Sequence, residues 1–167
     1  ATALAMNVGA TLTDVKAGLE QRSQVKGRLF PIQVTSNLLL LDDTYNANKD
    51  SLCAAIDVLN SYDAFRILCV GDMKELGENS LAIHREVGQY ANSANLDLVC
   101  SYGNESAVIS EAVSGKHFTD KVEMVDFLVP LIETQLQQNN KVVVLGKGSR
   151  SMKMEDVIYS LKDKIKC

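Results

Sequence analysis

The sequence has no apolar run of the roughly 20 residues that a membrane-spanning helix needs. It also lacks an excess of positive charge, since 17 Lys and Arg stand against 21 Asp and Glu, giving a formal net charge of -4. We therefore expect neither a nucleic-acid partner nor insertion into a membrane. No signal-peptide pattern and no initiator Met opens the chain, and Ala1 stands within helical sequence. This start is typical of a cut within a longer polypeptide.

Metal-binding and disulfide patterns are also absent. The four cysteines, at positions 53, 69, 100 and 167, form no Cys-x-x-Cys pair, and His84 and His117 have no neighbouring ligand cluster. We interpret the thiols as inert groups in the reducing cytoplasm, and we predict no metal ligands in this chain. Neither a Walker A loop nor a Gly-x-Gly-x-x-Gly fingerprint occurs, which argues against a P-loop nucleotide site and a dinucleotide site.

What is present is the composition of a packed globule, 46% hydrophobic and 23% charged. Residues 1–20 have the pattern of two short helices separated by a turn at Gly9-Ala10, with Thr13 as a possible cap of the second helix, which should end near Gly18-Leu19. The polar segment 21–27 follows and is the best candidate for a boundary. We predict that residues 1–26 end one domain and that residues 27–167 form another.

From residue 29 onward the pattern changes to strands that alternate with helices. Residues 30–35 and 38–41 form the pattern of a hairpin. Continuous apolar runs at 67–70, 98–100 and 142–145 are typical of strands covered on both faces. Between and after them lie apolar residues at helical spacing, in 52–59, 83–91, 122–136 and 154–165. This alternation predicts an α/β fold: a Rossmann-like, doubly wound, mostly parallel sheet with helices on both faces.

Ligands of such sheets bind outside the carboxyl ends of the strands, which directs attention to the loops 71–77, 101–106 and 146–151. The polar cluster 42–48 also follows a strand. A carboxylate at this place can accept both hydroxyls of a ribose, and an Asn side chain can bind a base edge or cap the next helix. From spacing alone, solvated acids with Asn48 or Asp50 as a helix cap is the slightly stronger interpretation.

The loop Gly146-Lys147-Gly148-Ser149-Arg150 lies between a strand and a helix. It offers backbone N–H groups and two cations, a combination suited to a phosphate or a carboxylate. A glycine turn with solvated cations is an equally good interpretation. A lone helical His84 is more often a hydrogen-bonded packing residue than a base. Arg28, taken by itself, has the pattern of a surface charge.

Taken in order, however, these segments are specific. The series is Gly27-Arg28-Leu29-Phe30, Asp42-Asp43-Thr44-Tyr45-Asn46-Ala47-Asn48, Gly71-Asp72-Met73-x-Glu75-Leu76-Gly77, His84 with Gly88, and Lys147-Gly148-Ser149-Arg150. It resembles the Mur ligases over essentially the whole chain, and most of all the type that acts on D-alanyl-D-alanine. The resemblance implies the end of the central ATPase domain followed by the Rossmann-like C-terminal domain.

The resemblance further implies a cytoplasmic, monomeric enzyme of peptidoglycan synthesis. Such an enzyme joins D-alanyl-D-alanine to UDP-N-acetylmuramoyl-tripeptide with ATP and Mg²⁺, through an acyl phosphate. Carried over by position, Arg28 would meet the ATP phosphates, and Asp43, Tyr45, Asn46 and Asn48 would bind the nucleoside. The dipeptide would face Tyr102, Asn104, Lys147, Gly148, Ser149 and Arg150.

Two positions depart from the family pattern, since Lys49 replaces a frequent Pro and Gly146 a frequent β-branched residue. The phosphate-binding loop, the magnesium ligands and the nucleotide-sugar domain would have to precede Ala1, so we expect this chain alone to be inactive. Two alternatives stay open: a different amide ligase, either another Mur enzyme or a folylpolyglutamate synthetase, and a stand-alone Rossmann-like binding module.

Overall fold

The computed structural model describes residues 2–20 and 25–165. Two helices, α1 (Thr2–Asn7) and α2 (Leu12–Glu20), come first and contact each other. The cap of α2 is Thr11 and not Thr13: the Thr11 hydroxyl accepts the Asp14 N–H at 3.2 Å, and the Asp14 carboxylate accepts the Thr11 N–H at 2.9 Å. Thr13 lies inside the helix, which ends later than we predicted. Most of the predicted linker, residues 21–24, falls outside the described residues.

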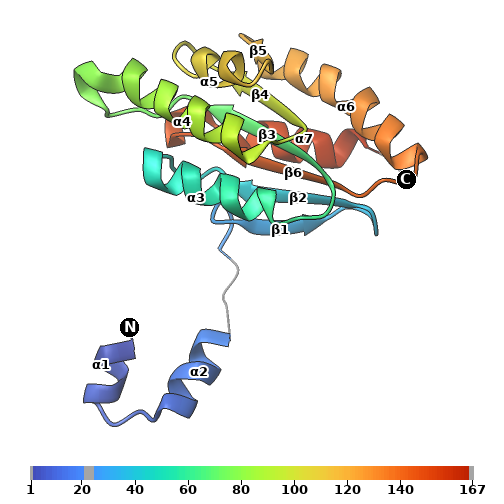
Figure 1. Cartoon of the computed structure of the whole chain (residues 1–167). Helices are drawn as coiled ribbons and strands as arrows, with labels where there is room; N and C mark the ends of the chain where they lie inside the picture. Colours follow the sequence, from blue (N-terminus) through green and yellow to red (C-terminus); the bar gives the residue numbers. More distant parts are fainter. Residues whose placement is uncertain (1, 21–24, 166–167) are drawn as a thin grey trace.

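The rest of the chain forms one six-stranded sheet with the order β1-β2-β6-β3-β4-β5 (Figure 1). Strands β1 (Phe30–Gln33) and β2 (Leu38–Asp43) form the predicted antiparallel hairpin. The others pair in parallel: β3 (Phe65–Gly71), β4 (Leu98–Tyr102), β5 (Lys116–Phe118) and β6 (Val142–Lys147). The predicted α/β fold is confirmed, although the short strand β5 and the helix before it were not predicted.

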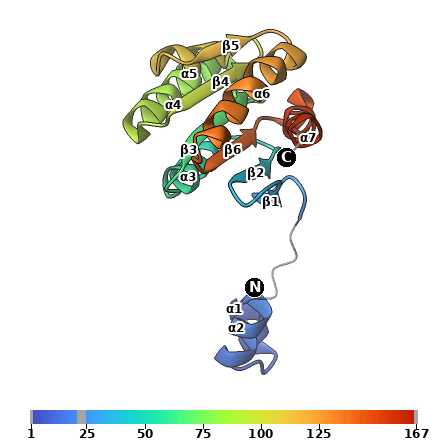
Figure 2. The ribbon, with the colours of Figure 1, turned by 90° about the vertical axis from the view of Figure 1, so that its right-hand side faces the viewer.

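Helices cover both faces of this sheet (Figure 2). On one face lie α3 (Lys49–Asn60), α4 (Ser80–Ala94) and α5 (Ala107–Ala112), and on the other α6 (Lys121–Gln137) and α7 (Glu155–Lys164). The alternation of side chains along a strand creates the two cores: Ile67 and Cys69 of β3 face α6 and α7, whereas Leu68 and Val70 face α3 and α4. Two short 3-10 turns, η1 (Gly77–Asn79) and η2 (Arg150–Met152), precede α4 and α7.

The position of β6 determines where a ligand can bind. The chain passes from β2 through α3 to β3, and it returns to fill the gap between them with β6 only after α6. The helices that follow β2 and β6 therefore leave toward opposite faces of the sheet. The carboxyl ends of β2, β6 and β3 thus border a topological switch point, the usual place of a ligand crevice in such a sheet.

Candidate functional site

Two adjoining cavities open at the carboxyl ends of these strands. The small cavity has a volume of about 290 Å³ and is lined by Gly27, Arg28, Asp43, Tyr45, Asn46, Ala47, Asn48, Ser51 and Lys147. The large cavity has a volume of about 660 Å³ and is lined by Tyr45, Asn46, Ala47, Asn48, Lys74, Glu75, Leu76, Ser149, Arg150 and Ser151. The segment 45–48 lines both cavities, so the loop after β2 forms a wall that the two cavities share.

Of the two acids at the end of β2, only Asp43 lines a cavity. Asp42 is buried, and its carboxylate accepts hydrogen bonds from the Thr44 hydroxyl at 2.6 Å and from the Tyr159 hydroxyl at 3.4 Å. Burial, and next the Asp42 charge, raise the pKa of Tyr159. Asp42 thus anchors the strand end, which leaves Asp43 as the carboxylate that a ligand in the small cavity can reach.

Asp43 itself is held from two sides. Its Oδ1 accepts the Leu29 N–H at 3.0 Å, and its Oδ2 lies 2.6 Å from the Lys147 ammonium. That ammonium also donates to the Asn46 carbonyl at 3.0 Å, and the Lys147 side chain is only 4% exposed. Asp43 and Lys147 are register partners on the adjacent parallel strands β2 and β6. The sequence predicted both residues, but it did not predict that they form one ion pair.

The two predicted asparagines lie between the compartments. Asn48 is the N-cap of α3, because its side chain accepts the Ser51 N–H at 2.8 Å and the Ser51 hydroxyl pairs with the Asn48 N–H at 3.1 Å. The capping interpretation is confirmed for Asn48. The Asn46 side chain accepts the Ala47 N–H at 2.9 Å. Both amide groups still line the cavities, so a cap and a ligand contact are compatible.

Arg28 reaches the small cavity from the segment before β1. Its guanidinium lies 4.7 Å from the centre of the Tyr45 ring, which is a cation–π distance. Gly27 has a φ of +80°, and a Cβ there would lie 3.2 Å from Tyr45. The Tyr45 N–H donates to the Gly27 carbonyl at 3.0 Å. Arg28 is therefore tied to the loop after β2 and is not an isolated surface charge.

The loop after β6 divides its residues between the two cavities. Lys147 points to the small cavity, whereas Ser149 and Arg150 line the large one. The Ser149 hydroxyl accepts the Lys74 N–H at 2.8 Å, and the Arg150 guanidinium binds the Glu155 carboxylate at 2.6 Å. Gly148 is closely packed, because a Cβ there would lie 3.1 Å from the Gly71 Cα and 2.9 Å from Met154. The structure thus separates Lys147 from the residues with which the sequence grouped it.

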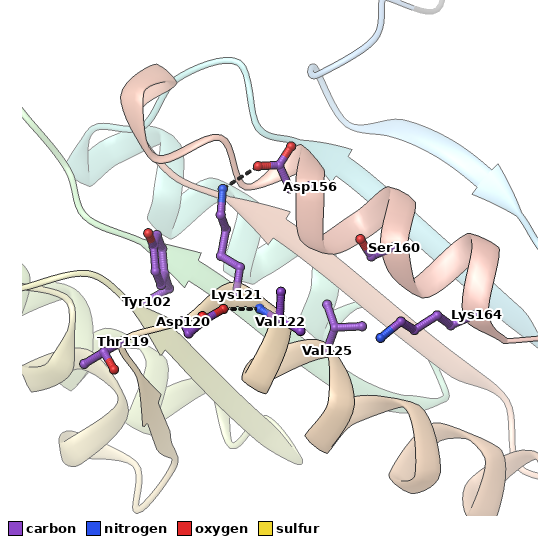
Figure 3. Close-up of a pocket in the computed structure, with 9 residues that line it drawn as sticks. All are labelled: Tyr102, Thr119, Asp120, Lys121, Val122, Val125, Asp156, Ser160 and Lys164. Carbon is purple, nitrogen blue, oxygen red and sulfur yellow. Dashed lines mark hydrogen bonds and ion pairs between the residues drawn. The ribbon is translucent and has the colours of Figure 1, made fainter.

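Tyr102 also lies apart from Ser149 and Arg150. It lines a third cavity of about 370 Å³ between α6 and α7, with its ring centre 5.6 Å from the Lys121 ammonium (Figure 3). The ammonium is in turn bound to Asp156 and to the carbonyl groups of Met152 and Lys153. The other predicted residue of the β4 loop, Asn104, is exposed, and its N–H donates to Asp72 at 3.0 Å. The six residues predicted for the dipeptide therefore do not form one pocket.

Several site residues were not predicted. Lys74, Glu75 and Leu76 line the large cavity, and a strand-exit loop bracketed by glycines was the only sequence signal for them.

His84 is buried, with its Nε2 accepting the Met73 N–H at 3.0 Å and its Nδ1 2.8 Å from the Ser80 carbonyl. This geometry requires the proton on Nδ1. The interpretation of His84 as a packing residue that is hydrogen-bonded in the core is confirmed.

Three of the four cysteines lie within the residues that the structure describes, and two of these three are buried. Cys69 and Cys100 are buried as predicted, and burial raises the pKa of both thiols, whereas Cys53 is only half-buried and Cys167 lies outside the described residues. Among residues 2–20 and 25–165, no group of three or more His, Cys, Asp or Glu side chains could hold a metal ion. No helix within these ranges is long and apolar enough to span a membrane.

Comparison with known proteins identifies the family of this chain. Residues 27–150 match the family described as Mur ligase, glutamate ligase domain. The whole chain is 95% identical to part of UDP-N-acetylmuramoyl-tripeptide–D-alanyl-D-alanine ligase of Haemophilus influenzae and 48% identical to that of Escherichia coli, covering 36% of each. The chain thus spans about a third of the length of the curated relatives it matches.

Solved structures give the same result. A crystal structure of MurF from Acinetobacter baumannii matches 98% of the chain and 36% of its own, with a TM-score of 0.87 at 35% identity. MurF ligase from Thermotoga maritima in complex with ADP matches 97% of the chain and 36% of its own, with a TM-score of 0.78 at 26% identity. The family match over residues 27–150, together with these relatives, shows that this chain belongs to the Mur ligase family.

Proposed function

We propose that this chain is the C-terminal part of an ATP-dependent ligase that joins D-alanyl-D-alanine to UDP-N-acetylmuramoyl-tripeptide. The names of the relatives at 95% and 48% identity support this substrate pair. The observation that carries the proposal is the small cavity, where Arg28, Asp43 and Lys147 converge from three separate segments. A preformed pocket with an oriented carboxylate and a nearby guanidinium suits a nucleotide with its ribose and phosphates.

In this proposal the small cavity binds the nucleoside of ATP. Asp43 would accept the ribose hydroxyls, since its carboxylate lines the cavity and Lys147 fixes its orientation. Tyr45, which is 53% exposed, and the amide groups of Asn46 and Asn48 would contact the base. Arg28 would extend from Tyr45 toward the phosphates. The complex of the Thermotoga maritima relative with ADP supports an adenine nucleotide as the ligand.

The large cavity would receive the dipeptide. Its carboxylate is an anion, and Lys74 and Arg150 place two cations on the lining, with Ser149 as a hydrogen-bonding group. We now assign Ser149 and Arg150, with Gly148 as a close-packing residue, to this compartment. Lys147 moves to the nucleotide side. Tyr102 lines a different cavity, so in the loop after β4 a dipeptide contact is proposed only for Asn104.

The chemistry of the proposed reaction explains why two adjoining cavities are needed. The tripeptide carboxylate attacks the γ-phosphorus of ATP, forming an acyl phosphate and releasing ADP. The dipeptide amine then attacks the acyl carbon, and phosphate leaves as the amide forms. The acyl phosphate must be kept from water between the two steps, which closure of domains around the site can provide. The loop 45–48, shared by both cavities, would hold nucleotide and acceptor next to each other.

Magnesium is the cofactor that such a reaction uses, and no group of three or more His, Cys, Asp or Glu side chains that could hold a metal ion occurs among the residues that the structure describes. We propose that its ligands, the phosphate-binding loop and the tripeptide site belong to other domains of the whole enzyme. Residues 1–26 would then end the central ATPase domain and residues 27–167 would form the C-terminal domain. The enzyme would act as a cytoplasmic monomer, and this chain alone would bind ATP weakly and have no ligase activity.

The test is an ADP-release assay of the full-length enzyme with UDP-N-acetylmuramoyl-tripeptide and a panel of acceptors: D-alanyl-D-alanine, L-lysine, D-glutamate and a folate. We expect acceptor-dependent turnover with D-alanyl-D-alanine only. Turnover with another acceptor and none with the dipeptide would contradict the proposal. The isolated chain serves as the control, and we expect it to release no ADP under the same conditions.

A further inference from the structure

Asp72, the first residue after β3, is a carboxylate with every acceptor position occupied by the protein. It is 1% exposed. Its Oδ1 accepts the N–H groups of Glu105 at 3.1 Å and Ser106 at 2.9 Å. Its Oδ2 accepts the Asn104 N–H at 3.0 Å and the Lys74 ammonium at 2.9 Å. Three consecutive N–H groups of the loop after β4 therefore converge on one side chain from the loop after β3.

This arrangement requires glycine at position 103. Gly103 has a φ of +130°, a conformation that side chains other than hydrogen rarely adopt. A Cβ on Gly103 would lie 2.3 Å from Oδ1 of Asp72. The loop after β4 can close around the carboxylate only because this position carries no side chain.

The loop after β6 joins the same network through the backbone. The Ser149 N–H donates to the Asp72 carbonyl at 3.0 Å, and the Ser149 hydroxyl accepts the Lys74 N–H at 2.8 Å. Gly71 and Gly148 pack against each other without side chains. The loops after β3, β4 and β6 are thus held together around the residue pair Asp72 and Ser149.

The consequence for the large cavity is direct. Lys74, Ser149 and Arg150 line it, and Asp72 fixes the first of these by an ion pair. Asp72 cannot itself bind a substrate, since it is buried and its oxygens already accept four hydrogen bonds. We propose that Asp72 is a positioning residue for the acceptor: it aligns Lys74 and the loop 104–106 for the dipeptide, and it leaves the nucleotide compartment unaffected. This inference rests on the proposed function.

The experiment compares Asp72→Asn with the unchanged full-length enzyme. An amide has one oxygen and cannot accept all four donors, so the loop 104–106 and Lys74 lose their common anchor. We expect the KM for D-alanyl-D-alanine to rise on the order of 10- to 100-fold, as misplacement of binding groups by about 1 Å produces. The KM for ATP should stay within about twofold, because Asp43 and Lys147 are untouched.

The matched control is Asp97→Asn. Asp97 also accepts two hydrogen bonds across strands, from the Arg66 N–H at 2.8 Å and the Arg66 Nε–H at 2.9 Å, but it lies at the opposite end of β4. A merely structural loss would lower thermal stability in both variants without separating the two KM values. Equal rises of both KM values in Asp72→Asn, or no rise in either, would overturn the proposal.

Two further measurements keep the inference testable if Asp72→Asn folds poorly or if the proposed reaction is wrong. Gly103→Ala drives a methyl group into the same carboxylate and should raise the same KM selectively. Amide hydrogen exchange of the present chain does not depend on enzyme activity. Asp72→Asn should speed exchange at residues 104–106 and leave the exchange rate of the Arg66 N–H unchanged. Absence of dipeptide-dependent turnover in the unchanged enzyme would refute the proposed function, whereas unchanged exchange at 104–106 would refute the positioning role.

Discussion

The Lys147 ammonium lies 2.6 Å from the Asp43 carboxylate, in an ion pair between register partners of two parallel strands. Their side chains are 4% and 14% exposed. A buried pair with good hydrogen bonding is sensitive to the loss of either partner, because the other charge is then left without compensation. The same pair orients the carboxylate that we assign to the ribose. Stability and nucleotide binding therefore depend on one contact.

Replacement of Lys147 by Met should destabilise the chain by about 3 kcal/mol, since Asp43 would lose its buried counter-charge. Urea denaturation of the present chain measures this. Lys49→Met is the control: Lys49 pairs with Glu86 on the exposed surface, and removal of that pair should leave the denaturation midpoint unchanged. Equal changes of the denaturation midpoint in the two variants would show that the ion pair of Lys147 with Asp43 stabilises the chain no more than an exposed pair does.

Asp43→Asn should raise the KM for ATP in the full-length enzyme about tenfold or more and leave the KM for the dipeptide nearly constant, because a single amide oxygen would replace the carboxylate that we propose as the acceptor of two ribose hydroxyls. Steady-state kinetics with either substrate varied will show this. The Asn variant is preferable to Ala, since its amide keeps an oxygen that can still accept a hydrogen bond from Lys147, whereas Ala keeps none. If Asp43→Asn unfolds the domain instead, the acid is structural and the nucleotide role fails.

Arg28→Ala should lower turnover on the order of tenfold or more, because a guanidinium near the phosphates would be lost. Unchanged kinetics would remove Arg28 from the phosphate site. Tyr45→Phe is the matched control. It preserves the aromatic ring that stacks on Arg28 at 4.7 Å, and its turnover should stay close to that of the unchanged enzyme.

Asp72 should contribute to acid unfolding. Burial opposes its ionisation, but the hydrogen bonds from the Lys74 ammonium and from the Ser106 and Asn104 N–H groups outweigh burial and hold its pKa well below the ordinary value for an aspartate. A carboxyl group with a lowered folded-state pKa adds stability above its unfolded pKa and loses it as pH falls. The free energy of unfolding, measured from pH 5 to pH 2, should therefore fall less steeply with decreasing pH in Asp72→Asn. The difference in slope should correspond to the uptake of up to about one proton on unfolding. An identical slope in both proteins would contradict the assignment.

Substitution by Ala should destabilise the chain to different extents at Gly146, in β6, and at Gly148, in the loop that follows it. A Cβ at Gly148 would press on the backbone of Gly71, at 3.1 Å, whereas a Cβ at Gly146 would meet the side chain of Ile158 at 2.6 Å. Since a side chain can move and a packed backbone cannot, Gly148→Ala should destabilise more than Gly146→Ala, by about 1–3 kcal/mol. Ile158→Val should partly restore Gly146→Ala and should have no such effect on Gly148→Ala. Thermal melts of the four variants decide this.

The sequence predicted the fold because its pattern is local. The apolar runs at 67–70, 98–100 and 142–145 became β3, β4 and β6, each longer by two or three residues. A strand that is covered on both faces is apolar at consecutive positions, and this pattern is visible within a short stretch of sequence. The short strand β5 escaped prediction because its three residues are too few to show a period. The ordered motifs also identified the family, and the site segments were named correctly as strand-exit loops.

Which of these residues meet was decided by the tertiary structure. Lys147 follows Gly146 and precedes Gly148 in sequence, yet its side chain belongs with Asp43, because β6 is inserted between β2 and β3 and aligns position 147 with position 43. Tyr102 and Asn104 stand two residues apart, but Tyr102 lines the cavity between α6 and α7, whereas the Asn104 N–H donates to Asp72. No sequence pattern marked Asp72 as the anchor of four donors from two loops. Spacing along one chain fixes which face a residue occupies, whereas contacts between loops follow from strand order, and that order depends on how both cores are packed.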